Sequence, residues 1–191
     1  GAKKAVKRVL AYLAGTKKRG IFYSPENEAN FRKRYEEIAS KSGQNLPDTC
    51  AFSDSDFMGC SLTFRSTSGS ILYHRGTPIT WSAKRQTVKA TSTCQAEYVG
   101  LYDTILISQS QGYFDWFFQE RKIPLLFCDN QSAIHLSKQS LTTKKSKHIE
   151  MRYHHVREFA ADLSFCPTGH NRADPLTKGL SAEKYIAMFR A

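Results

Sequence analysis

The sequence has little of what marks a secreted protein, a membrane protein or a cysteine-based metal site. Its five cysteines are odd in number and widely scattered, and no two of them have the spacing of a CxxC pair. We therefore expect reduced thiols in an intracellular protein. No stretch is long and apolar enough to span a membrane, and we expect no secretory signal before the fold. The chain also has no initiator methionine, and we expect it to be a piece cut from something longer.

Acidic residues are scarce relative to basic ones. The chain has 17 acidic and 28 basic residues, a formal net charge of +11 and a pI near 9.5. Such an excess favours a polyanionic partner over a charge that serves solubility alone. Hydrophobic residues make up 40% of the 191, a balance typical of a globular chain long enough for one domain with a core.

Hydrophobic patterns predict an α/β domain over residues 49–191. Strands are expected at 50–57, 69–75, 77–85, 124–129 and 163–168, and helices from Ser92 to about Glu120, at 130–138, at 147–162 and at 180–190. Ser92 with Gln95 fits a capping box at the start of the longest helix, and Gly112 is expected to interrupt it. This order predicts a mixed five-stranded sheet, with three antiparallel strands followed by parallel ones, flanked by helices.

The segment 1–48 is expected to be separate from that domain. Residues 3–16 have apolar side chains at helical spacing, with basic residues opposite, and predict an amphipathic helix. Residues 20–24 predict a strand. The stretch 25–48 holds many charges, Pro25 and Pro47, and is interpreted as a linker with one or two helical turns.

Four acidic residues fall where an α/β sheet would gather a site. Asp54 lies in the first predicted strand, Glu97 in the first turns of the long helix, Asp129 at the end of a buried strand, and Asp174 after the last strand. Carboxylates brought together repel unless hard cations such as Mg²⁺ or Mn²⁺ join them. Asp56 would share a face with Asp54, so the strand pattern alone does not decide between them. The alternative is that these four residues are ordinary surface acids that bind no metal.

Seven segments, in this order and spacing, resemble the pol polyprotein of copia-type LTR retrotransposons. They are "KRVLAYLAGTKKRGIFYS", "FSDSDFMG", "RSTSGSILYHRGTPITWSAKRQ", "STCQAEYVGL", "FCDNQSAIHLS", "TTKKSKHIEMRYHHVRE" and "RADPLTK". The resemblance is to the ribonuclease H domain, preceded by the tail of the reverse transcriptase, and it covers most of the chain.

The resemblance implies a ribonuclease H-like fold and endonucleolytic hydrolysis of the RNA strand of RNA–DNA hybrids during reverse transcription. It assigns catalysis, with two Mg²⁺ or Mn²⁺ ions, to Asp54, Glu97, Asp129 and Asp174. It places Asp54 as the shared ligand and Asp56 as a companion. The implied partners are the hybrid and the reverse transcriptase of the same polyprotein, with no membrane. The implied location is the cytoplasm, within virus-like particles, or the nucleus.

This sequence departs from the family at two positions near the acids. The family usually has an acidic residue where Gln95 stands, and often an aspartate where Cys60 stands. Neither departure changes the four carboxylates.

Several polar residues are candidates for contact with the hybrid. They are Arg65, Ser66, Thr67, Asn130, Gln131, Lys144, Lys145, Lys147, His148 and Arg152. The alternatives are a plain turn at 65–68, a helix cap at 130–132 and a solvated helix face at 144–157. His170, four residues before Asp174, is a candidate for assisting product release. Trp81 is expected in the core.

Two other classes of function remain open. A non-catalytic nucleic-acid-binding or scaffolding module, from a domesticated or decayed element, would also be basic. An integrase of the same fold fits less well, because integrases typically use three acids with the glutamate last.

Overall fold

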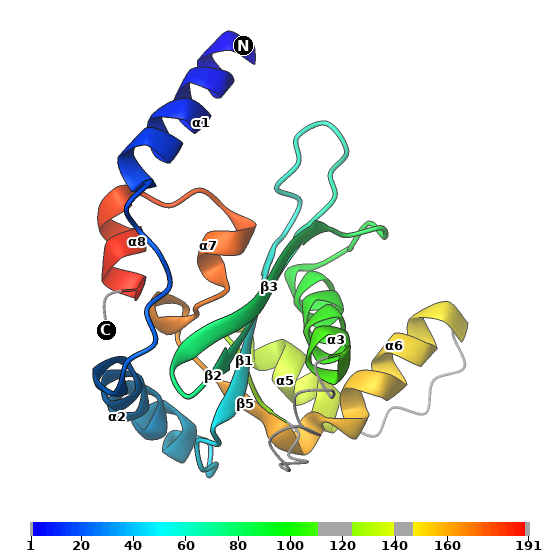
Figure 1. Ribbon diagram of the computed structural model, residues 1–191. Helices are drawn as coiled ribbons and strands as arrows, with labels where there is room; N and C mark the ends of the chain where they lie inside the picture. The colour runs from blue at the N-terminus through cyan, green and yellow to red at the C-terminus, as the bar shows by residue number, and fades with distance from the viewer. Residues whose placement is uncertain (1, 111–123, 140–146, 190–191) are drawn as a thin grey trace.

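A five-stranded mixed sheet forms the centre of the computed structural model, which describes residues 2–110, 124–139 and 147–189 (Figure 1). The strands are β1 (Thr49–Asp56), β2 (Thr67–His74), β3 (Thr77–Arg85), β4 (Leu125–Cys128) and β5 (Leu163–Phe165). Their order is β3-β2-β1-β4-β5. β1, β2 and β3 pair antiparallel, whereas β4 pairs parallel with β1, and β5 parallel with β4. This topology confirms the predicted ribonuclease H-like fold.

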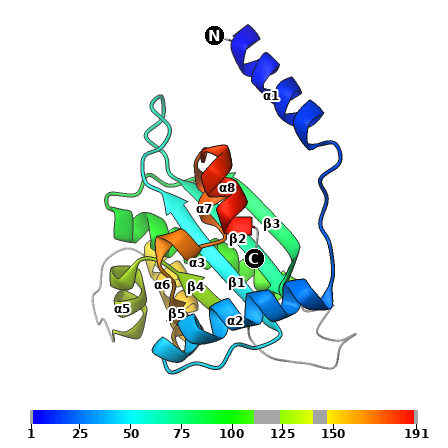
Figure 2. The same cartoon turned by 90° about the vertical axis from the view of Figure 1, so that its left-hand side faces the viewer.

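Helices cover both faces of the sheet (Figure 2). One face carries α3 (Thr93–Ser110), α5 (Gln131–Lys138) and α6 (Lys147–Glu158), and the other carries α2 (Pro25–Lys41), α7 (Asp174–Thr177) and α8 (Ala182–Phe189). Short 3-10 turns, η1 (Ala160–Asp162) and η2 (Thr168–His170), flank β5. Alternate β1 residues serve the two cores, since Phe52 packs on the α2 side and Ala51 on the α3 side. The part of the long helix expected at 111–120, with Gly112, lies outside the described residues.

The helix α1 (Ala2–Thr16) confirms the prediction for residues 3–16 but buries no side chain. In both views it lies apart from the sheet (Figures 1 and 2). The strand expected at 20–24 is wrong, because these residues pair with no strand and Ile21, Phe22 and Tyr23 are exposed. A short apolar run predicts a strand only where a neighbouring strand can accept its backbone hydrogen bonds.

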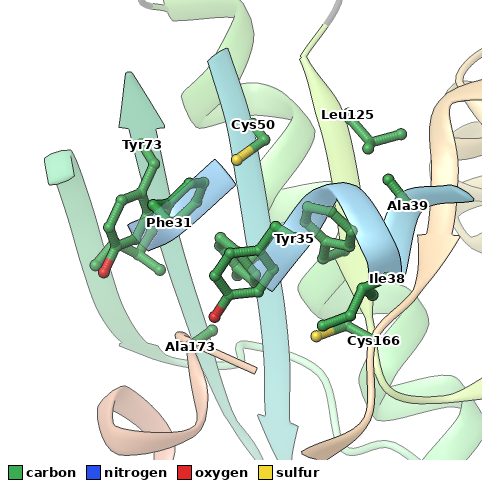
Figure 3. Packing of buried hydrophobic residues seen from close by; sticks show 12 residues of the cluster. Phe31, Tyr35, Ile38, Ala39, Cys50, Tyr73, Leu125, Cys166 and Ala173 are labelled. Atoms are coloured by element: carbon green, nitrogen blue, oxygen red, sulfur yellow. The ribbon is translucent and has the colours of Figure 1, made fainter. Parts of the chain in front are cut away.

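The linker expected at 25–48 is also wrong, because most of it is the 17-residue helix α2. Ser24 caps the helix by accepting a hydrogen bond from the Asn27 N–H at 3.1 Å, and Pro25 occupies the first turn. Four apolar residues at helical spacing are buried against the sheet: Phe31, Tyr35, Ile38 and Ala39. Figure 3 shows this packing. Among the described helices, none combines the length and apolar character needed to cross a membrane.

Candidate active site

Asp54 and Asp129 lie side by side because their strands are parallel neighbours. The last registered pair between β1 and β4 is Ser53 with Cys128, and each aspartate follows its member of that pair. Asp54 is buried, at 3% exposure, whereas Asp129 is half-buried at the edge of the site. Both predicted carboxylates therefore lie at the carboxyl end of the central strands.

Asp174 reaches the same place as the first residue of α7. The Asn171 side chain donates to the Ser53 carbonyl at 2.8 Å, which fixes the preceding loop beside Asp54. Helix α7 lies directly on β2 at Gly69, where an added Cβ would lie 2.7 Å from Thr177 Cγ2 and 2.9 Å from the Ala173 carbonyl oxygen. Only glycine allows this close approach, so Gly69 sets the position of the helix that carries Asp174.

Glu97 enters the site from the first turns of α3. The Ala96 carbonyl accepts hydrogen bonds from Ser55 Oγ and from the buried Gln86 Nε2, both at 2.9 Å, which ties this end of α3 to β1. The expected cap at Ser92 is present, with the Gln95 N–H donating to Ser92 Oγ at 3.1 Å. The Gln95 side chain, however, accepts from the Thr91 N–H at 2.7 Å and not from that of Ser92.

The carboxylates repel one another strongly. Burial raises the pKa of Glu97 to about 9, and the charges of Asp54 and Asp129 add to this rise. Burial raises the pKa of Asp54 to about 6; a hydrogen bond from Thr177 opposes the rise, and the charges of Asp129 and Asp174 add to it. Glu97 Oε2 is buried and has no hydrogen-bond partner among the described residues. Such a cluster is stable in its ionised form only when a cation binds it.

The chemistry of the donors fits a hard divalent cation. Ligand atoms of Glu97, Cys128 and Asp129 lie within 4.8 Å of one another. Burial raises the pKa of the Cys128 thiol well above its usual value. The carboxylate oxygens of Glu97 and Asp129 are hard donors, which suit Mg²⁺ or Mn²⁺.

Three residues that contact the carboxylates had no predicted role. Lys178 Nζ lies 2.5 Å from Asp174 Oδ1. The Thr177 hydroxyl donates to Asp54, and the Thr168 hydroxyl donates to Asp129 Oδ2 at 2.7 Å. The spacing of Lys178, four residues after Asp174, is the one signal in the sequence that could have found a contact, because side chains four apart meet on a helix.

Comparison with known proteins identifies the family. No protein-family model matches the chain. It is 31% identical over 189 residues to the retrovirus-related Pol polyprotein from transposon TNT 1-94 of Nicotiana tabacum, covering 95% of this chain and 13% of that protein. It is 32% identical over 186 residues to the Pol polyprotein from transposon RE2 of Arabidopsis thaliana, covering 93% of this chain and 11% of that protein. The chain is homologous to part of a retrovirus-related Pol polyprotein.

The predicted resemblance to copia-type Pol polyproteins is thereby confirmed. This Pol homologue spans only 11–13% of the length of these curated relatives. Among solved structures, LC11-RNase H1 in complex with RNA/DNA hybrid matches with a TM-score of 0.48 and 16% identity, over 67% of this chain and 92% of that chain. The amino-terminal RNase H domain of a Mycobacterium tuberculosis protein matches with a TM-score of 0.47 and 14% identity, over 73% and 92%. Likenesses of this strength do not bear on function, and the fold rests on the strand order itself.

The site separates Asp54 from Asp56. In this Pol homologue Asp56 lies at the end of β1, where an added Cβ on Gly59 would collide with its carboxylate. The charges that raise the pKa of Glu97 include those of Asp54 and Asp129. Asp54 therefore belongs to the carboxylate cluster, and Asp56 lies beside the cluster at the end of β1.

The predicted hybrid-binding residues differ in exposure, and only some of them have a side chain that a substrate could contact. Ser66 is fully buried, and its hydroxyl accepts from the Met58 N–H at 3.2 Å, so its side chain is not available to a phosphate. Asn130 caps α5 by accepting from the Ala133 N–H at 2.9 Å, which is the alternative role considered for it. Arg65 and Gln131 are exposed, and Thr67 begins β2.

The remaining described candidates belong to α6 and η2. The Arg152 guanidinium lies 5.4 Å from the centre of the Tyr102 ring. His170 is exposed in η2, next to the loop that leads to Asp174. Lys144 and Lys145 lie outside the described residues, and Lys147 and His148 are described only as backbone at the start of α6. Trp81, expected in the core, is 55% exposed on β3, so that prediction is wrong.

Proposed function

We propose that this chain is a ribonuclease H that hydrolyses the RNA strand of RNA–DNA hybrids during reverse transcription of a retrotransposon. The observation that carries the proposal is the convergence of Asp54, Glu97, Asp129 and Asp174 from four different elements. Stability alone does not account for this convergence, because mutually repelling buried carboxylates destabilise a fold unless they are neutralised.

These four residues would hold two Mg²⁺ or Mn²⁺ ions, with Asp54 as the shared ligand. When bound, the ions supply an activated water and stabilise the leaving oxygen of the phosphodiester. The Thr177 and Thr168 hydroxyls orient Asp54 and Asp129, which leaves their remaining oxygen lone pairs for metal. The exposed edge of Asp129 gives the substrate access to an otherwise buried site.

The charge of the chain supports a polyanionic substrate. A net charge of +11 favours long-range attraction of a nucleic acid duplex, and exposed Arg65 and Gln131 are candidate contacts with it. The homology to Pol polyproteins supports a reverse transcriptase in the same polyprotein as partner. We place the activity in the cytoplasm, within virus-like particles, or in the nucleus.

The test is cleavage of a labelled RNA–DNA hybrid in Mg²⁺ or Mn²⁺. We expect cleavage of the RNA strand by the wild-type chain and its loss in Asp54→Asn and Asp129→Asn, with Asp56→Asn as the matched control that remains active. A folded chain that cleaves in neither metal overturns the enzymatic proposal. Salt-sensitive binding of the hybrid without cleavage would then favour the non-catalytic module.

A further inference from the structure

We propose that α2 is part of the catalytic unit and that Tyr35 is a positioning residue for Asp174. The inference rests on the proposed function for the role of Asp174 in metal binding. It goes further by assigning a role in the site to a segment that precedes β1 and that the sequence pattern had indicated to be a linker.

The Tyr35 hydroxyl joins α2 to the loop that carries Asp174. It donates a hydrogen bond to the His170 carbonyl at 2.8 Å and accepts one from Arg172 Nε at 2.7 Å. Burial raises the pKa of Tyr35 to about 12, although the nearby Arg172 charge opposes the rise, so the hydroxyl keeps the proton that it donates. One side chain of α2 thus holds the loop at two points, both within four residues of Asp174.

The Arg172 guanidinium is buried in an aromatic cage built largely by α2. Arg172 is 2% exposed, and its guanidinium carbon lies 5.5 Å from the Tyr35 ring centre and 6.0 Å from those of Phe31 and Tyr73. A cation is seldom buried unless several contacts replace its water, and the cage and the Tyr35 oxygen supply such contacts. The docked α2 therefore stabilises this conformation of the loop.

The fixed loop extends without a break to Asp174. Asn171 is fully buried and bonds both the Ser53 carbonyl, at 2.8 Å, and the Ala173 N–H, at 3.1 Å. Ala173 packs in the same core cluster as Tyr35, and Figure 3 shows the Tyr35 hydroxyl pointing toward it. Asp174 then follows directly as the first residue of α7. The position of its carboxylate depends on contacts made by α2.

Further contacts tie the amino-terminal half of α2 to the sheet. Arg75 Nε, in the turn between β2 and β3, lies 3.1 Å from Glu28 Oε1, and Arg32 pairs with Asp48 just before β1. The catalytic unit therefore begins at the Ser24 cap, and a boundary at residue 48 would remove part of its support.

The experiment compares Tyr35→Phe with Tyr98→Phe in the full chain. Tyr98 is the matched control, because it is equally buried and its hydroxyl also donates to a backbone carbonyl, that of Tyr153 at 3.2 Å on α6. The readouts are Mn²⁺ affinity by calorimetry, thermal unfolding, and kcat and KM on the hybrid. We expect Tyr35→Phe to weaken Mn²⁺ binding by about tenfold and to lower kcat with little change in KM, as when a group that supports a metal ligand is removed. Tyr98→Phe should lose stability without either effect.

Equal Mn²⁺ affinities in the two variants, with wild-type cleavage intact, overturn the positioning role but not the proposed function. A wild-type chain that neither binds Mn²⁺ nor cleaves overturns both. If Tyr35→Phe does not fold, hydrogen exchange of the wild-type chain decides. Peptides from 25–41 and from 170–176 should then open together in mild denaturant, whereas earlier opening of 25–41 with 170–176 still protected contradicts the proposal.

Discussion

The Lys178 ammonium lies 2.5 Å from the Asp174 carboxylate, at the point where a divalent cation is proposed to bind. Burial acts to lower the pKa of Lys178, but the bond to Asp174 and the charges of Asp54 and Asp129 outweigh it, so the pKa is raised. Lys178 therefore acts as a counter-cation for the cluster when no metal is bound. A metal ion that takes Asp174 as a ligand would compete with this ammonium for the carboxylate.

Replacing Lys178 by Met should tighten metal binding. Because the lysine is 46% exposed, its ion pair contributes little, and we expect a gain of about 1 kcal/mol, or roughly fivefold in Kd. Calorimetric titration with Mn²⁺ measures the effect. Lys184→Met, at an exposed position on α8, is the control for a lost positive charge. Unchanged or weaker binding in Lys178→Met would contradict competition between the ammonium and the metal.

The sequence pattern predicts that the four acidic residues lie at or near the ends of elements around the sheet. The resemblance to copia-type Pol polyproteins, and not the pattern, selects Asp54 over Asp56, and the metal-binding role of the four stays a prediction. Asp129 ends an apolar run, and Asp54 lies in an aromatic strand. Their convergence follows from parallel pairing of β1 with β4, a consequence of the fold class.

The support of the site could not be predicted in the same way. Charged residues surround Phe31 and Tyr35 in the sequence, so the helical spacing of the apolar residues of α2 is hard to recognise. The contact of Tyr35 with His170 joins residues that are 135 positions apart, which no local pattern predicts. Trp81 faces solvent on the edge strand β3, and composition alone does not distinguish an exposed face of an edge strand from a buried one.

Without divalent metal, the chain should become less stable as the pH rises from about 4.5 to about 9. The folded-state pKa of Glu97 is about 9 against an ordinary value of 4.5, so the folded chain binds more protons than the unfolded chain in this range. The contribution of Glu97 to stability is fully present below its unfolded pKa and is lost as the pH rises through the folded pKa. Glu97 alone should contribute a slope of about 1.4 kcal/mol per pH unit at most. Below about pH 6 the raised pKa of Asp54 adds a slope of the same sign.

Urea unfolding with a chelator at pH 5 to pH 9 measures this loss. Glu97→Gln should flatten the dependence, because its side chain does not ionise, and added Mg²⁺ should restore stability most at high pH. If the stability of the wild-type chain changes with pH in parallel with that of Glu97→Gln, Glu97 is not the group that causes the loss.

Cys60 should be the most reactive thiol among the described cysteines. The Thr63 side chain, and then the Thr63 and Leu62 backbone, lower the pKa of the Cys60 thiol to about 7. The thiolate therefore predominates above pH 7, whereas burial raises the pKa of Cys50, Cys128 and Cys166. Iodoacetamide labelling followed by peptide mass spectrometry should modify Cys60 with a midpoint near pH 7. Thr63→Val should move that midpoint upward, and an unmoved midpoint would remove Thr63 as the cause.

Gly69→Ala should damage the site by displacing α7. An added Cβ would lie 2.7 Å from Thr177 Cγ2 and 2.9 Å from the Ala173 carbonyl, so α7 must shift away from β2. Overpacking of this kind costs about 1–3 kcal/mol, and displacing Asp174 by about 1 Å should lower the cleavage rate by roughly a hundredfold. Gly179→Ala, where nothing lies within 4 Å of the added Cβ, is the matched control and should change neither quantity. Thermal unfolding and single-turnover cleavage measure the two effects. A Gly69→Ala chain that is destabilised but cleaves at the wild-type rate would show that the position of α7 does not control the site.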